Sequence, residues 1–88
     1  MPKVLITHDV KDVEHWLRGK AERVAAFPGG ATVTDLVASD GSNRAAVLAE
    51  VDDVDALMAF VASPPPEAAA KAESHGVDFA TFAVYVEA

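Results

Sequence analysis

The residues best suited to proton transfer stand in one stretch near the start of the chain, KVLITHDVKDVEHW, residues 3–16. It contains His8 and His15, and an imidazole titrates near neutral pH. His8 has the same strand parity as Val4 and Ile6, so its ring is expected on their side of a strand. We predict that His8 faces either a ligand pocket, as a catalytic acid, base or donor, or a buried core or subunit interface.

Two carboxylates and one tryptophan lie close to His8 in the sequence. Asp9 or Asp12 could orient the imidazole, but Asp12 precedes a helical pattern and is better suited to cap that helix. Trp16 falls on the apolar stripe of the same helix. It has two interpretations, a packing residue of the core or a flat wall that binds an aromatic ligand.

Two residues further along the chain are weaker candidates for ligand binding. Tyr85 is either a core or dimer contact or a pocket wall, and Arg44 could reach an anionic group at a pocket mouth. His15 is expected on the surface and His75 at a helix end. No helical HxxxH pair or cysteine is present, so no metal site is predicted.

Length and charge restrict the classes of function. The 88 residues suffice for one domain, residues 1–88. The formal charge of −7, with seven scattered basic residues, argues against nucleic acid and anionic membranes as partners.

No secretory signal or membrane span is recognisable, so a cytoplasmic protein is expected. No Ser-His-Asp order or phosphate-binding loop is present, and no cofactor is predicted.

Apolar periodicity predicts four strands and three helices. The first helix should begin after Asp12 and end at Pro28, with Gly19 marking either a weak point or a close contact. Its apolar and its solvated side chains are expected on opposite sides of the helix. The strands are expected near residues 4–6, 31–39, 44–51 and 77–86. The stripe comprises Val13, Trp16, Leu17, Ala21, Val24 and Phe27, and the solvated side Lys11, Glu14, Arg18, Glu22 and Arg23.

The second half of the chain carries clear helix boundaries. Asp53 is expected to cap the second helix, which should stop at Ser63. Ser63 is also interpreted as the N-cap of a third helix that begins with Pro64, in preference to a polyproline ligand segment. Gly76 is expected to end that helix in a left-handed conformation.

The order of elements predicts the α+β ferredoxin-like fold, βαββαβ, with a four-stranded antiparallel sheet and helices on one face. Strands one, three and four are apolar on both sides. In the fourth strand, Phe82, Val84 and Val86 are expected opposite Phe79 and Tyr85. Because helices cover only one face, we infer that a second copy covers the other in a homodimer.

The pattern His8-x-Val10-x-Asp12-x-x-x-Trp16, with Val51-Asp52-Asp53 and Ser63-Pro64, resembles the dimeric α/β-barrel superfamily across the whole chain. This group includes antibiotic-biosynthesis-monooxygenase-like, EthD-like and muconolactone-isomerase-like proteins. The resemblance implies a sheet-to-sheet dimer with a pocket between sheet and helices in each subunit. Haem-degrading members place a tryptophan on later helices, which this chain lacks.

Two functions remain open at the level of sequence. The first is a cofactor-independent, monooxygenase-like or isomerase-like protein for a small aromatic or polyketide-like metabolite, with His8 moving a proton and Trp16 holding the ring. The second is a non-catalytic dimer that binds a ligand or a protein. A fold by itself does not choose between them.

Overall fold

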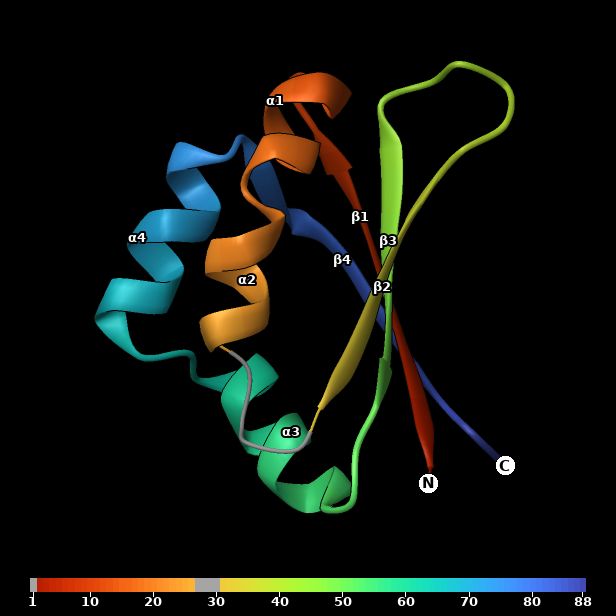
Figure 1. Cartoon of the computed structure of the whole chain (residues 1–88), viewed down its shortest axis with the longest axis vertical. Helices are drawn as coiled ribbons and strands as arrows, with labels where there is room; N and C mark the ends of the chain where they lie inside the picture. The colour runs from red at the N-terminus through yellow and green to blue at the C-terminus, as the bar shows by residue number, and fades with distance from the viewer. Residues whose placement is uncertain (1, 27–30) are drawn as a thin grey trace.

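The computed structural model describes residues 2–26 and 31–88. The four strands form one antiparallel sheet in the order β2-β3-β1-β4. All helices lie on one side of this sheet (Figure 1). The elements are β1 (Lys3–Val10), α1 (Val13–Arg18), α2 (Lys20–Ala26), β2 (Thr32–Val37), β3 (Arg44–Glu50), α3 (Val54–Ala62), α4 (Pro66–Ser74) and β4 (Val77–Val86).

This arrangement confirms the predicted ferredoxin-like fold. Strand β1 occupies the centre of the sheet, between β3 and β4. Its side chains alternate between buried and half-buried, as expected for a strand with one face against helices. Two clusters form the core. One contains Val4, Ile6, Ala49, Val51 and Leu57, and the other Val10, Trp16, Ala45, Val47 and Val77.

The predicted first helix is two helices, because the chain breaks at Gly19. The backbone N–H of Gly19 closes α1 by donating to the carbonyl of Trp16, and α2 starts at the next residue. The ring of His75 packs against this glycine, where an added Cβ would lie 2.5 Å from the His75 Cε1 atom. Both alternatives predicted for Gly19, a weak point and a close contact, are therefore confirmed.

The break also changes which side chains face the core, so the predicted apolar stripe is partly wrong. Trp16 is fully buried, but Leu17, Ala21 and Val24 are exposed. Arg23, predicted to be solvated, instead turns inward. A helix that restarts after a break does not continue the 100° step between successive side chains. Phe27, also predicted in the stripe, lies outside the described residues.

The boundaries of the later helices follow the predicted capping chemistry with one correction. Asp53 caps α3, its carboxylate accepting from the backbone N–H of Ala56 at 3.0 Å. Ser63 is not the N-cap of α4 but the C-cap of α3. Helix α4 begins at Pro66, two residues after the predicted start at Pro64, and a different proline therefore occupies the first position. Gly76 follows α4 with a φ of +83°, as predicted.

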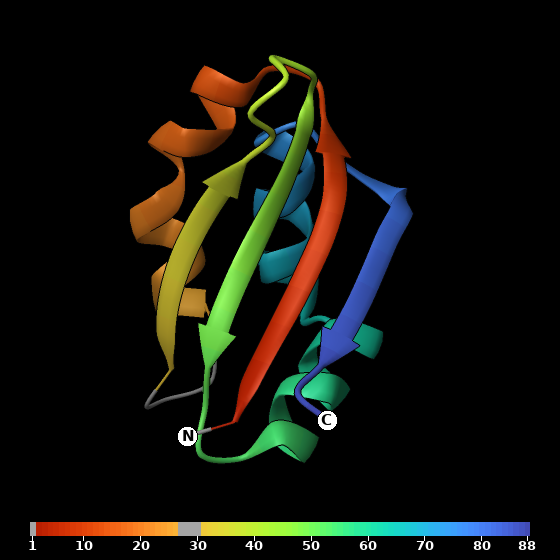
Figure 2. The same cartoon turned by 90° about the vertical axis from the view of Figure 1, so that its right-hand side faces the viewer.

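No helix of the described residues lies over the other face of the sheet (Figure 2). Its side chains come from the residues that alternate with the core positions of each strand. Leu36 and Tyr85 are exposed on it, and Leu5 and Leu48 are half-buried. No helix in the described part of the chain is long and apolar enough to cross a membrane.

Candidate functional site

A small apolar pocket lies between the helices and the covered face of the sheet. Its volume is about 100 Å³. Strands β1, β3 and β4 supply its floor and helices α2, α3 and α4 its walls. The lining residues are Ile6, His8, Glu22, Arg23, Val47, Phe60, Val61, Pro64, Ala68, Ala69, Lys71, Ala72, Val77, Phe79 and Phe82.

His8 is the polar side chain that strand β1 places in this pocket. Only 5% of the residue is exposed, and its ring stacks on Phe82 with centroids 5.2 Å apart. The His8 and Trp16 rings meet edge to face, with their centroids 5.5 Å apart. No described residue offers a hydrogen-bond partner to His8 Nδ1. The structure thus places an imidazole between two aromatic rings, with one nitrogen unpaired.

Burial lowers the pKa of His8 below its ordinary value of 6.5. The Arg23 guanidinium acts in the same direction, while the backbone of Asp9 and the carboxylates of Asp9 and Asp35 oppose it. A lowered pKa leaves the imidazole neutral at pH 7. A neutral imidazole has a free electron pair and can accept a proton.

An irregularity in β4 shapes the pocket beside His8. Thr7 of β1 pairs with Ala83 of β4, and Asp9 pairs with Asp78. Two steps along β1 therefore correspond to five along β4, so β4 contains three extra residues here. The Thr81 hydroxyl fills the gap, accepting from the Asp9 backbone N–H and donating to the Asp78 carbonyl, both at 2.8 Å. Bulges of this kind are common beside functional sites.

The three extra residues reverse the strand parity, so the prediction for Phe79 is wrong. Phe79 was expected on the opposite face from Phe82, but both line the pocket, with ring centroids 5.2 Å apart. Simple alternation does not anticipate a bulge, because an odd number of inserted residues moves every later side chain to the other face.

A buried ion pair joins α2 to β2 beside this pocket. The Arg23 and Asp35 side chains meet at 2.6 Å and are only 10% and 5% exposed. The guanidinium also covers the Trp16 ring, 4.1 Å from its centroid. Within the described part of the chain, Arg23 Nε, Asp35 Oδ1 and Trp16 Nε1 are buried without a hydrogen-bond partner. This cluster retains unused hydrogen-bonding capacity.

Sequence reasoning missed this ion pair. Asp35 alternates with Val33 and Val37 on the same face of the strand. A carboxylate between two positions that face the core indicates a buried partner, and this was the signal that could have revealed the pair. The partner on α2 was hidden by the unforeseen helix break.

Among the predicted site residues, only His8 lines the pocket directly. Trp16 lies behind His8 and Arg23 with no exposed surface. Tyr85 is 59% exposed and lies on the open face, paired with Leu5. Arg44 is also outside the pocket, where its Nε lies 3.8 Å from a carboxylate oxygen of Asp9.

Neither Asp12 nor the two remaining histidines line the pocket. Asp12 accepts from the His15 backbone N–H at 3.3 Å, which confirms it as the cap of α1. The exposed His15 and the buried His75 face each other with ring centroids 6.3 Å apart. No group of three or more potential metal ligands gathers anywhere in the described ranges.

These features define a ferredoxin-like α+β protein with an apolar pocket under its helices and a histidine in the pocket floor. A structure of similar fold is that of a Deinococcus radiodurans protein described as a "putative antibiotic biosynthesis monooxygenase". The superposition has a TM-score of 0.59 and covers 100% of this chain and 91% of that chain, with 11% sequence identity. This likeness establishes the fold. No protein-family profile matches the sequence, and no curated protein is similar enough to count as a relative.

Proposed function

We propose that the protein binds a small aromatic or polyketide-like molecule in the helix–sheet pocket and removes a proton from it with His8. The observation that carries the proposal is a buried imidazole of lowered pKa, with its Nδ1 atom unpaired, in an otherwise mostly apolar pocket. Perturbed titratable groups in concave apolar sites are frequent catalytic groups. The Deinococcus protein described as a putative monooxygenase shares the fold, and the choice of chemistry rests on the His8 pocket.

The chemistry of such a site begins with one step. His8 takes the proton of a phenol or of an acidic C–H, and the ligand keeps the electron pair. In an isomerisation, the imidazolium returns the proton to another carbon. In a cofactor-independent oxygenation, a phenol and O₂ yield a quinone and water. Phe79 and Phe82 would hold the ring, and Trp16 would hold His8 in place from behind.

We further propose a homodimer formed through the open face of the sheet. Leu5, Leu36, Leu48 and Tyr85 give this face an apolar surface. A contiguous apolar patch of this kind is unusual on a monomer. Sedimentation at micromolar concentration should give a dimer, and Leu48→Glu should dissociate it. A wild-type monomer at that concentration would contradict the dimer. The cytoplasm stays the location predicted from the sequence.

The proton-transfer proposal is tested with a panel of phenols and β-dicarbonyl compounds under oxygen. Oxygen uptake reports oxygenation, and exchange of the acidic C–H with D₂O reports the common first step. We expect His8→Ala to lower either rate about 10²- to 10⁴-fold. His15→Ala, on an exposed histidine, should leave the rate unchanged. Equal rates in wild type and His8→Ala would remove His8 from the chemistry.

The pocket volume favours a second candidate, a non-catalytic binding protein. Pockets for drug-sized ligands measure about 300 to 1,000 Å³, and this one is about 100 Å³. Saturable binding of a phenol without oxygen uptake or proton exchange would select this alternative.

A further inference from the structure

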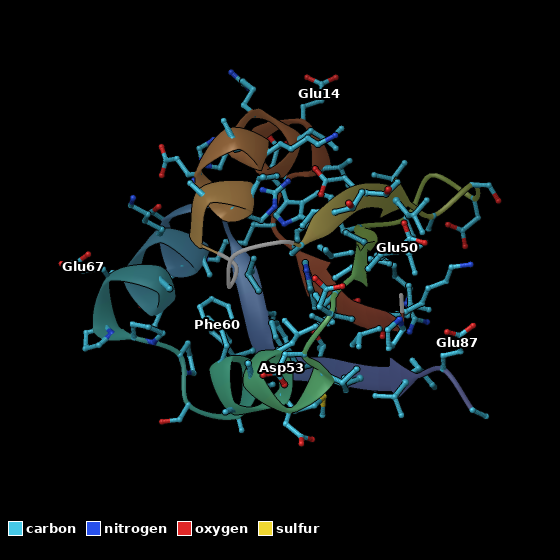
Figure 3. All side chains as sticks on the ribbon, turned by 60° about the horizontal axis from the view of Figure 1, so that its bottom comes forward. Glu14, Glu50, Asp53, Phe60, Glu67 and Glu87 are labelled. Carbon is cyan, nitrogen blue, oxygen red and sulfur yellow. The ribbon has the colours of Figure 1, made fainter. Side chains whose placement is uncertain are left out.

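The apolar pocket adjoins a second, outer hollow between α2, α3 and α4. The outer hollow has a volume of about 240 Å³. The two hollows share four lining residues, which together form what we call the neck: Glu22, Phe60, Ala68 and Lys71. Figure 3 shows the Phe60 ring directed from α3 into the space between α4 and the sheet. Because the neck residues also line the inner pocket, a ligand there can reach the Lys71 side chain.

The two hollows differ in the chemistry of their walls. The inner pocket is lined mainly by aliphatic and aromatic side chains. The outer hollow adds Glu67 to the charges of Glu22 and Lys71. An apolar cavity of about 150 Å³ accepts a benzene ring, so the inner pocket of about 100 Å³ takes one ring only if its walls move outward slightly. A ligand that fills both hollows carries a ring at one end and a polar group at the other.

Lys71 is the cation of the neck with no competing partner. No carboxylate in the described ranges lies within ion-pair distance of its ammonium group. By contrast, Arg23 is paired with Asp35 at 2.6 Å. The two acids lie differently. A Glu22 oxygen lies 3.6 Å from His75 Nε2, and the Glu67 side chain points away from the centre of the molecule in Figure 3.

We propose that Lys71 selects ligands whose ring carries a short side chain ending in a carboxylate. The ring occupies the inner pocket beside His8, and the carboxylate pairs with the Lys71 ammonium at the neck. The inference rests on the proposed function, because it assumes that the inner pocket takes an aromatic ring. It adds the substrate class, an aryl-alkanoate, and the residue that recognises it.

The test compares three ligands that share one ring and one chain: 3-phenylpropanoate, 3-phenylpropanamide and 3-phenylpropylamine. Trp16 is the only tryptophan of the chain and touches the pocket residue His8, so its fluorescence reports occupancy. We expect the carboxylate to bind about tenfold more tightly than the amide, and the amine most weakly. Added salt should reduce the tenfold difference.

Lys71→Met keeps the apolar stem and removes the charge. It should bring the carboxylate and the amide to equal affinity, and Lys71→Gln should do the same. Lys20→Met, on an exposed lysine of α2 that lines neither hollow, should keep the tenfold preference. Circular dichroism verifies that each variant folds.

Four results would overturn the inference. They are equal wild-type affinities for carboxylate and amide, a preference for the amine (which would point to Glu22), an unchanged preference in both Lys71 variants, and no binding of any of the three. The proposed function is judged separately, by the turnover of uncharged phenols in wild type and His8→Ala. If uncharged phenols turn over but the carboxylate is not preferred, the proposed role of Lys71 is refuted and the proposed role of His8 stands.

Discussion

Each face of the sheet holds a few side chains of the polarity usually found on the other face. The covered face buries His8 and Asp35 and receives Arg23 from α2, whereas the open face exposes Leu36 and Tyr85. Buried polar groups are costly unless paired, and exposed apolar groups in a patch are rare. The unpaired His8 nitrogen and the apolar patch are therefore not explained by folding of a lone subunit. The covered face suits a ligand, and the open face suits a partner.

Removing one carboxylate from each face should give the largest difference in the free energy of unfolding. Asp35→Ala leaves the Arg23 guanidinium buried without its partner, which should lower the free energy of unfolding by about 3 to 5 kcal/mol. Glu50→Ala removes an exposed pair, 4.0 Å from Lys3, and should cost less than about 1 kcal/mol. Urea denaturation of both variants measures the difference.

A double variant separates the ion pair from simple packing. Asp35→Leu combined with Arg23→Met replaces both charges by apolar groups and should recover most of the stability that Asp35→Ala loses. Similar costs for Asp35→Ala and Glu50→Ala would mean that the covered face is open to water.

The close packing of His75 on Gly19 gives the second largest effect. In Gly19→Ala the new methyl group would overlap the His75 ring, so we expect a loss of about 1 to 3 kcal/mol despite the better helix propensity of alanine. The matched control is the same change in a His75→Ala background, where the loss should disappear. A Gly19→Ala protein as stable as wild type would mean that the ring can move aside freely.

The sequence predicts the fold well and the site only in part, for reasons that separate local from long-range interactions. The caps at Asp12 and Asp53 depend on neighbouring residues and were predictable. The ion pair of Arg23 with Asp35 depends on a helix break and a tertiary contact. The position of Phe79 depends on three inserted residues in β4. A tertiary contact or an insertion has no periodic signal, because periodicity describes a regular element.

The Thr81 hydroxyl should contribute more to the free energy of unfolding than the Thr81 methyl group. Thr81→Val leaves the part-buried Asp9 N–H without its acceptor, which should cost about 1 to 2 kcal/mol. Because this hydroxyl holds the irregular segment of β4, the ring signals of His8 should also shift in the NMR spectrum. Thr81→Ser keeps the hydroxyl and should preserve both properties. Unchanged His8 signals in Thr81→Val would show that the segment is fixed by other contacts.

The smallest expected effect is a pH dependence that belongs to His8. Its pKa is lowered in the folded state by burial, relative to an unfolded value near 6.5. Below that pH the unfolded chain takes up a proton that the folded chain resists, so the free energy of unfolding falls as the pH falls. The slope due to this one group does not exceed about 1.4 kcal/mol per pH unit.

His8→Phe keeps a flat ring beside Phe82 and removes the titrating nitrogen atoms. The difference in unfolding free energy between this variant and wild type should be constant from about pH 7 to pH 8 and should grow toward about pH 5 in favour of the variant. A constant difference for His8→Phe over the whole range would mean that the folded protein accepts a charged imidazole in its covered face. The covered face would then resemble the open face in its access to water, and the electrostatic basis for a neutral base at His8 would be lost.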